Sequence, residues 1–290
     1  MNKPVMFSLV FALAACGGPG DTSDERIVAQ SQQTADTSYG SATIKGAASQ
    51  VADTRPGEIK LKKASFKNPL RDFITTATGH DLSYLHAGDP NGQPVIFVHG
   101  TPGSAGAWVD MFSVSPDDRF FLMSVDRPGF GKTTPNKVVR SLADQVRAIG
   151  ALIERSEKPV ILVGHSLGGP VVAWAAAEYP QKISGIVIAA GSLDPGLEKI
   201  HPAQYLGNAW PVSALLPNNL RVANRELLAL KPELEMLADM LPDIRSDVII
   251  VHGTRDKLVP YENVPFMQRG LSNAASLQII TLEGQNHFLP

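Results

Sequence analysis

The chain has 290 residues, 43% of them hydrophobic, and a formal net charge of −2 at pH 7. A chain of this length and hydrophobic content can build one large globular domain with an inserted segment. The near-neutral charge without a basic patch argues against nucleic acid as a partner, and the single cysteine, Cys16, excludes an internal disulfide.

Residues 1–15 are predicted to be a secretory signal peptide. A short positive start, Met1–Lys3, precedes the apolar segment Val5–Ala15, which is too short to span a bilayer as a mature helix. Its end, Leu-Ala-Ala followed by Cys16, resembles the bacterial lipobox, whose cysteine becomes the lipidated first residue of the mature protein. The alternative is an ordinary signal peptide with a chance cysteine. We expect a lipid on Cys16, an anchor in a bacterial membrane, and exposure to the periplasm or cell surface.

Residues 16–69 are expected to form a disordered tether behind the lipidated Cys16. The stretch is rich in Ser, Thr, Gln, Asp, Ala and Gly and has little periodic apolar content. A flexible coil of about fifty residues would let a folded domain lie roughly 40 Å from the membrane.

The folded domain is expected to cover residues 70–290 and to begin with a hairpin around Gly79. Beyond it, short branched runs alternate with helical patterns. The expected strands are 95–98, 120–125, 160–163, 183–189, 248–251 and 277–280, and the expected helices are 105–112, 142–154 and 171–178. We therefore predict an α/β fold in which helices cover both faces of a mostly parallel sheet.

Residues 193–246 interrupt this alternation and are expected to form a helical insertion. Prolines divide the stretch into short segments, and two helices are expected at residues 220–228 and 232–240. The second of these would open with Pro232.

The motif G-x-S-x-G occupies residues 164–168, where a predicted strand meets a predicted helix. A sharp turn there would strain the backbone of Ser166 and would require small neighbours, as Gly164 and Gly168 are. The alternative is a glycine-rich turn with a solvated serine. The strand-turn-helix context favours a nucleophile elbow, and on this motif the chain resembles the α/β-hydrolase family, in which a helical cap is commonly inserted over the active site.

The resemblance implies a catalytic triad in the chain order serine, acid, histidine. We expect Ser166 as nucleophile, Asp256 as the orienting acid and His287 as the base. Asp256 and His287 each follow a predicted strand, so both should reach the carboxyl edge of the sheet. Asp194 is a second candidate for the acid. The alternatives are a turn aspartate at 256 and a solvated terminus at 287.

The resemblance also implies an oxyanion hole made by the backbone N–H groups of Thr101 and Leu167. His99 and His165 are expected to be packing residues that point away from the reaction. The other histidines lack the spacing of metal ligands, so we expect neither a metal nor a cofactor.

The expected function is hydrolysis of a small or medium, mainly apolar ester, with an uncharged small molecule as the partner. Lactone hydrolysis, cleavage of a carbon–carbon bond next to a ketone, acyl transfer, and non-catalytic ligand binding by an anchored protein remain open. The insertion carries many large apolar side chains, and those not used to pack its helices onto the core are expected to line a mainly apolar pocket above Ser166. The alternative is that they all form the core of the insertion and leave a polar cavity. The candidates are Tyr205, Leu206, Trp210, Leu215, Leu216, Leu220, Leu227, Leu228, Leu230, Met236, Leu237 and Met240.

Overall fold

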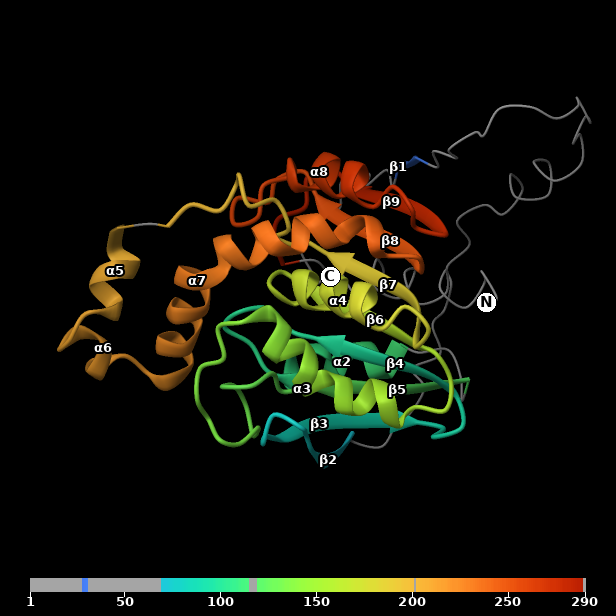
Figure 1. The fold of residues 1–290 in the computed structure, drawn as a ribbon, viewed down its shortest axis with the longest axis horizontal. Coiled ribbons are helices and arrows are strands. Elements are labelled where there is room, and N and C mark those ends of the chain that lie inside the picture. Colours follow the sequence, from blue (N-terminus) through green and yellow to red (C-terminus); the bar gives the residue numbers. More distant parts are fainter. Residues whose placement is uncertain (1–27, 31–68, 115–118, 201, 289–290) are drawn as a thin grey trace, which may run out of the picture.

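A nine-stranded sheet runs through the described residues of the computed structural model, which are 28–30, 69–114, 119–200 and 202–288 (Figure 1). Its strand order is β1-β9-β8-β7-β6-β4-β5-β3-β2. Strands β4 to β9 are parallel to one another, whereas β1, β2 and β3 pair antiparallel at the two edges. The strands are β1 Val28–Gln30, β2 Leu70–Thr75, β3 Asp81–Gly88, β4 Gln93–Val98, β5 Phe120–Val125, β6 Val160–His165, β7 Ile183–Ala189, β8 Asp247–Gly253 and β9 Ser276–Leu282.

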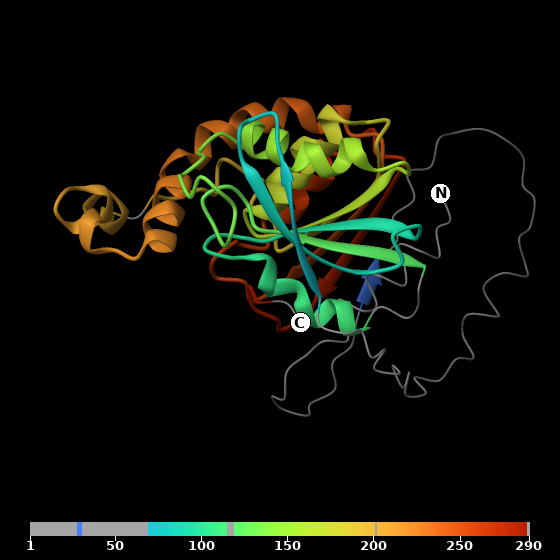
Figure 2. The same cartoon turned by 90° about the horizontal axis from the view of Figure 1, so that it is seen from below.

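Helices cover both faces of the sheet, as predicted (Figure 2). Residues of α3, α4, α7 and α8 share one apolar cluster with the sheet, and residues of η1 and α2 share another on the opposite face. The helices are η1 Ala105–Trp108, α2 Val109–Val114, α3 Leu142–Arg155, α4 Gly168–Glu178, α5 Pro202–Asn208, α6 Val212–Leu215, α7 Asn218–Met240, η2 Leu241–Asp243 and α8 Asn263–Gly270. None of those described is long and apolar enough to cross a membrane.

The central strands are apolar on both faces because both faces are covered. In β4, Ile96 packs into the cluster of α3 and α4, whereas the next side chain, Phe97, packs on the other face. Phe97 contacts Trp108 and Phe112 with ring centroids 5.1 and 6.0 Å apart. This two-sided burial explains why the parallel strands are continuous apolar runs rather than alternating ones.

Three residues of the predicted tether, which covers residues 16–69, belong to the sheet. Val28–Gln30 forms β1 and pairs antiparallel with β9, with Val28 opposite Thr281. Without this strand, β9 would be a sheet edge with unpaired backbone N–H and C=O groups, and a short extended segment satisfies them. The predicted signal peptide, Cys16 and most of the tether lie outside the described residues.

The structure also corrects the two short helices predicted at 220–228 and 232–240, which are one continuous helix, α7, with Pro232 inside it. Proline has no N–H for the helical bond and typically costs about 3 kcal/mol within a helix. Leu230, Leu234 and Leu237 are buried against the core, and their burial offsets this cost.

The helical insertion predicted between β7 and β8 is present, but its first part extends away from the body. In Figures 1 and 2, α5 and α6 project from the side of the molecule toward which β7 points, and α7 returns across the sheet. No residue of α5 is buried. We name residues 202–217, which include α5 and α6, the α5–α6 projection.

Candidate active site

Strand β6 passes into α4 through a tight turn at Ser166. The φ of Ser166 is 54°, and only Ser166 and Ala190 have positive φ among the described residues other than glycine. The Ser166 N–H donates to the carbonyl of Ala189 at 3.0 Å, and its own carbonyl accepts from the N–H of Gly169 at 2.9 Å. The strained turn predicted from the motif is therefore present, held by backbone bonds on both sides.

The two motif glycines are required by close backbone approaches. A Cβ atom on Gly164 would lie 2.2 Å from the carbonyl oxygen of Gly168, and one on Gly168 would lie 2.3 Å from that of Val98. Both distances are far below a van der Waals contact, so any side chain would push the helix away from the strands. The prediction that small residues must flank the serine is confirmed.

Asp256 and His287 form a buried hydrogen-bonded pair at the carboxyl edge of the sheet. His287 Nδ1 lies 2.8 Å from Asp256 Oδ2, and the other carboxylate oxygen accepts the N–H groups of Leu258 at 2.9 Å and Val259 at 2.8 Å. Burial alone would raise the pKa of Asp256, but the bonds from His287 and Val259 lower it below its usual range. Since an ionised carboxylate only accepts, His287 Nδ1 is the donor in this bond.

Asp194, the second candidate for the acid, has other partners. Its carboxylate accepts the N–H of Gly196 at 2.8 Å, and its own N–H donates to the side chain of Asn263 at 2.8 Å. This is the local bonding of a turn aspartate. The structure pairs His287 with Asp256 and holds Asp194 in its own loop.

Ser166 and His287 line one cavity of about 450 Å³ at this edge. Between the Ser166 hydroxyl and the His287 ring the structure has no hydrogen bond. Thr101 also lines the cavity, and Leu167 follows the serine as the N-cap of α4. The remaining lining residues are His99, Gly100, Pro102, Gly103, Ala107, Trp108, His165, Ala189, Leu258 and Phe288.

The apolar walls of this cavity do not come from the insertion, which corrects the sequence prediction. None of the described residues of α5, α6 or α7 lines it. In α7, Leu230 and Leu237 pack into the core. Trp210 and Leu215 are exposed on the α5–α6 projection. Helix η1 and the sheet-edge loops supply the walls instead, through the apolar side chains of Pro102, Ala107, Trp108, Leu258 and Phe288.

A buried ion pair holds the loop after β4 against α7. The guanidinium of Arg127 donates to Glu226 at 2.9 and 3.3 Å and to the carbonyls of His99 and Gly100, both at 2.9 Å. Glu226 also accepts the hydroxyl proton of Thr101 at 2.7 Å. The Arg127 and Glu226 side chains are 0% and 1% exposed. The sequence analysis did not predict this pair, because the two residues lie 99 positions apart and no local pattern joins them.

Three histidines at this edge are held neutral by burial. His99 donates from Nδ1 to the carbonyl of Gly100 at 2.6 Å and accepts the N–H of Arg127 on Nε2 at 3.1 Å. His252 donates from Nε2 to the carbonyl of Val259 at 2.9 Å. Burial lowers the pKa of His252 and holds that of His99 well below its ordinary value.

His165 contacts His287 directly, contrary to the expectation that it points away from the site. Its Nε2 donates to the backbone carbonyl of His287 at 2.9 Å, and the two ring centroids are 4.8 Å apart. Burial also lowers the pKa of His165. A neutral His165 therefore holds the chain segment that carries His287.

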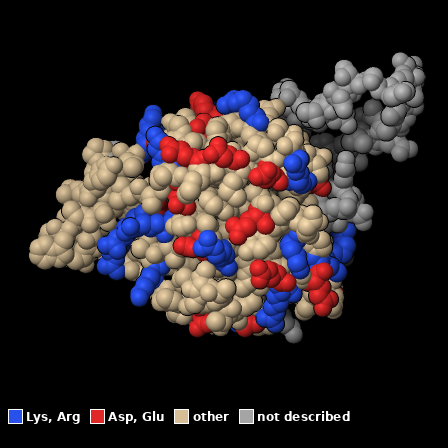
Figure 3. Space-filling view, in the orientation of Figure 1, with Lys and Arg blue, Asp and Glu red and all other residues tan. Residues whose placement is uncertain are grey.

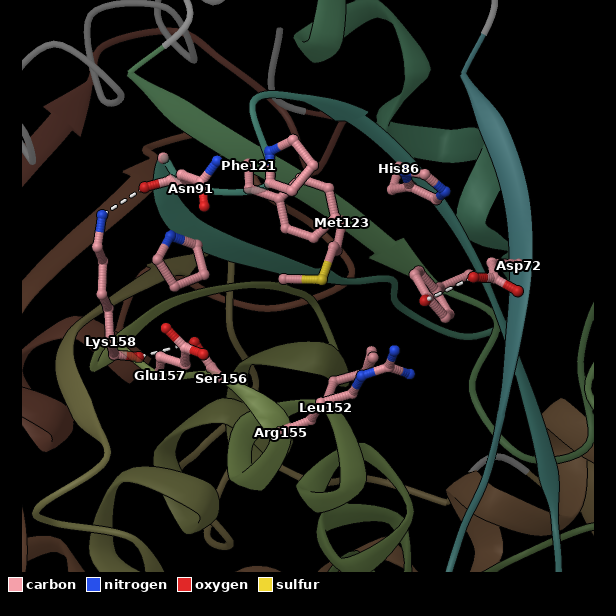
Figure 4. A pocket seen from close by; sticks show the side chains of 14 residues that line it. Asp72, His86, Asn91, Phe121, Met123, Leu152, Arg155, Ser156, Glu157 and Lys158 are labelled. Carbon is pink, nitrogen blue, oxygen red and sulfur yellow. Dashed lines mark hydrogen bonds between the residues drawn. The ribbon is translucent and has the colours of Figure 1, made fainter.

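A second cavity of about 440 Å³ lies at the opposite edge of the sheet, beside the starts of β4, β5 and β6 (Figure 4). It is lined by mixed charged and apolar side chains, among them His86 and Arg155, and Lys158 donates to the carbonyl of Asn91 across one end. Ligands of parallel sheets bind at the carboxyl edge. The cavity that contains Ser166 is therefore the candidate active site. No cluster of three potential metal ligands occurs within the described ranges.

Comparisons with known proteins agree with this architecture. Residues 95–290 match the family described as "Alpha/beta hydrolase family". The uncharacterized hydrolase YugF of Bacillus subtilis (strain 168) is 30% identical over 148 residues, which are 50% of this chain and 52% of that protein. Monoacylglycerol lipase abhd6-B of Xenopus laevis is 32% identical over 114 residues, covering 38% of this chain and 34% of that protein. The chain thus spans about half or less of the length of these relatives.

Among solved structures, the monoacylglycerol lipase of Paleococcus ferrophilus has a TM-score of 0.60 at 21% sequence identity. The match covers 71% of this chain and 90% of that one. At this identity the similarity shows a shared fold.

We predict that the free energy of unfolding decreases as the pH falls below about 6.5. Burial lowers the pKa values of His99, His165 and His252 in the folded protein. At a pH between the folded and the unfolded pKa, each of these histidines binds more protons in the unfolded chain than in the folded one. The free energy of unfolding therefore falls by up to about 1.4 kcal/mol per pH unit for each histidine, starting near the unfolded pKa of about 6.5. Urea unfolding from about pH 7.5 to about pH 5.5 measures this loss.

The matched variant for this prediction is His99→Gln, because the amide oxygen of glutamine can accept the N–H of Arg127. It is expected to reduce the pH dependence of the free energy of unfolding in this range. An unchanged slope in the variant would contradict the assignment of a neutral, buried His99.

Proposed function

The chain belongs to the alpha/beta hydrolase family, and on that basis we propose that it is a serine hydrolase that cleaves a carboxylic ester through an acyl-enzyme on Ser166. The observation that carries the proposal is the Asp256–His287 pair, joined at 2.8 Å, whose histidine shares a cavity with a serine in a strained strand-to-helix turn. A serine hydroxyl is a poor nucleophile without a base, and a histidine in this place can supply one.

In the proposed reaction, Nε2 of His287 accepts the proton of the Ser166 hydroxyl while the serine oxygen attacks the ester carbonyl. Asp256 holds the ring by the bond to Nδ1 and stabilises the imidazolium that forms. Collapse of the tetrahedral intermediate breaks the ester bond, and His287 returns the proton to the leaving alcohol. A water molecule, activated by the same histidine, then releases the acid and restores the serine.

The negative charge on the carbonyl oxygen would be received by the backbone N–H groups of Leu167 and Thr101. Leu167 stands at the start of α4, where N–H groups have no intrahelical partner. Thr101 is held by its hydroxyl bond to Glu226, within the network around Arg127. This network would keep the Thr101 loop in place as charge develops, which is the preorganisation that such stabilisation requires.

The cavity walls favour an uncharged substrate with a small or medium acyl group. Trp108, Leu258 and Phe288 offer apolar contacts, and each buried methylene contributes about 0.8 kcal/mol. A charged substrate would lose hydration without a matching partner in these walls. One of the similar proteins named above, abhd6-B of Xenopus laevis, is a monoacylglycerol lipase, which supports an acyl ester as the substrate class.

The nucleophile is tested by covalent labelling. We predict that a fluorophosphonate adds a single adduct at Ser166 and that Ser166→Ala abolishes both labelling and turnover of a short p-nitrophenyl ester. Mass spectrometry of the digested protein locates the adduct. A folded protein that takes no label, or that carries the label elsewhere, is not a serine hydrolase at this site, and ligand binding without turnover would then be the better description.

The acid is tested by two matched aspartate variants. We predict that Asp256→Asn lowers kcat by about 10⁴, because the histidine loses the partner that fixes its tautomer. Asp194→Asn should stay close to the unmodified protein, since the Asp194 carboxylate accepts the N–H of Gly196 in its own loop, a bond that an asparagine oxygen can also accept. Steady-state kinetics with circular dichroism as the folding control distinguish the two, and a collapse of Asp194→Asn alone would reverse the assignment.

The substrate class is tested by p-nitrophenyl esters of increasing acyl length. We expect kcat/KM to rise roughly fourfold per methylene, which corresponds to about 0.8 kcal/mol, until the cavity is filled. Trp108→Ala should flatten the rise. A flat or falling kcat/KM from the shortest ester onward would reject an apolar acyl site without affecting the triad.

We also propose that Cys16 carries a lipid that anchors the mature protein outside the cytoplasm, with residues 17–69 as its connection to the domain. The support is the sequence of residues 1–16. Cys16→Ser should move the protein from the membrane fraction to the soluble fraction and abolish incorporation of labelled fatty acid. Retained incorporation would disprove lipidation at Cys16.

A further inference from the structure

The α5–α6 projection is an uncharged surface on an otherwise charged molecule. From residue 200 to residue 220 the sequence contains no Asp, Glu, Lys or Arg, although these types make up 19% of the chain. Figure 3 shows the projection as a continuous surface without charged side chains, next to a body that carries both signs. A surface exposed only to water ordinarily carries charged side chains, so contact with water does not explain the composition of the projection.

Large apolar side chains are exposed on this surface. Trp210 is 84% exposed, Leu215 83%, Leu206 64% and Tyr205 60%. They are contributed by α5, α6 and the turn between them, and α5 has no buried residue at all. Large apolar side chains exposed together on one short segment are typical of a site of interaction.

Two arginines stand at the base of the projection. Arg221 donates to the side-chain oxygen of Asn218 at 2.7 Å, and Arg225 donates to that of Asn208 at 3.2 Å. Both acceptors are amides, which carry no charge. In Figure 3, basic side chains gather where the projection joins the body.

We propose that the α5–α6 projection inserts into the interface of an anionic phospholipid bilayer. Apolar side chains would enter the acyl region, and Trp210 and Tyr205 suit the boundary where one end of a ring is apolar and the other is hydrated. Arg221 and Arg225, further back, would meet lipid phosphates.

The place of the projection in the fold links this contact to the cavity. The projection follows the carboxyl end of β7, the same sheet edge at which Ser166 and His287 lie (Figure 1). Insertion would therefore bring this edge toward the bilayer. The proposal concerns binding alone and can be measured without any turnover by Ser166.

Tryptophan fluorescence of the full chain gives a direct test. A Cys16→Ser background removes any lipid anchor from the measurement. Trp108 and Trp174 are each 7% exposed, so a blue shift on mixing with vesicles reports mainly on Trp210. We expect the shift with phosphatidylcholine vesicles that contain phosphatidylglycerol, together with quenching by brominated acyl chains, and we expect both effects to be lost in Trp210→Phe.

Vesicle flotation in the same background tests the surface itself. Trp210→Glu with Leu215→Glu should lower the partition coefficient about tenfold or more, from the apolar area withdrawn from the bilayer. Leu70→Glu, at a side chain 66% exposed on β2, is the matched control and should bind like its parent. Arg221→Gln with Arg225→Gln should weaken binding to vesicles that contain phosphatidylglycerol and should leave binding to pure phosphatidylcholine vesicles unchanged.

Two results would overturn the proposal. One is equal flotation of the parent and of the Trp210→Glu, Leu215→Glu variant. The other is a parent that does not bind vesicles and sediments as a dimer, together with a Trp210→Glu, Leu215→Glu variant that sediments as a monomer. That result would assign the surface to a second copy of the chain.

Discussion

The buried ion pair between Arg127 and Glu226 is the interaction on which the candidate site and the insertion both depend. Isolating two charges from water costs several kcal/mol for each ion, and only close geometry with further hydrogen bonds offsets that cost. Here the guanidinium also binds the carbonyls of His99 and Gly100, and the carboxylate also binds the Thr101 hydroxyl. Removing either partner would leave an unpaired buried charge, at a cost of about 3–5 kcal/mol. The pair therefore ties the loop beside Ser166 to the helix that returns from the projection.

Three neutral histidines also stabilise the carboxyl edge of the sheet by hydrogen bonds from their rings to backbone carbonyls. His99, His165 and His252 each donate one ring N–H to a carbonyl, and burial keeps each of them uncharged. His165 matters most for chemistry, because its acceptor is the carbonyl of His287. The histidine proposed as the base is thus held at its side chain by Asp256 and at its backbone by His165. Such double support fixes a catalytic group within the narrow limits that proton transfer requires.

The insertion has two parts, and only one of them packs against the body of the protein. Helix α7 buries Leu230, Leu234 and Leu237 against the core, whereas the projection buries almost nothing and keeps its apolar side chains outside. The cavity takes its apolar walls from η1 and the sheet-edge loops instead. A bilayer that received the projection would lie near that same edge, so an apolar substrate dissolved in the membrane could reach the cavity without crossing much water.

The sequence by itself determined the order of strands β4 to β9 and of the helices between β4 and β7, the strained turn at Ser166, and the placement of Asp256 and His287 after parallel strands. These follow from local rules, because apolar periodicity defines each element and the carboxyl ends of parallel strands share one edge. Only the tertiary structure paired Asp256, rather than Asp194, with His287, joined Arg127 to Glu226, added β1 to the sheet and kept α7 intact through Pro232. Each of those outcomes rests on contacts between distant parts of the chain, whose energies no local pattern records.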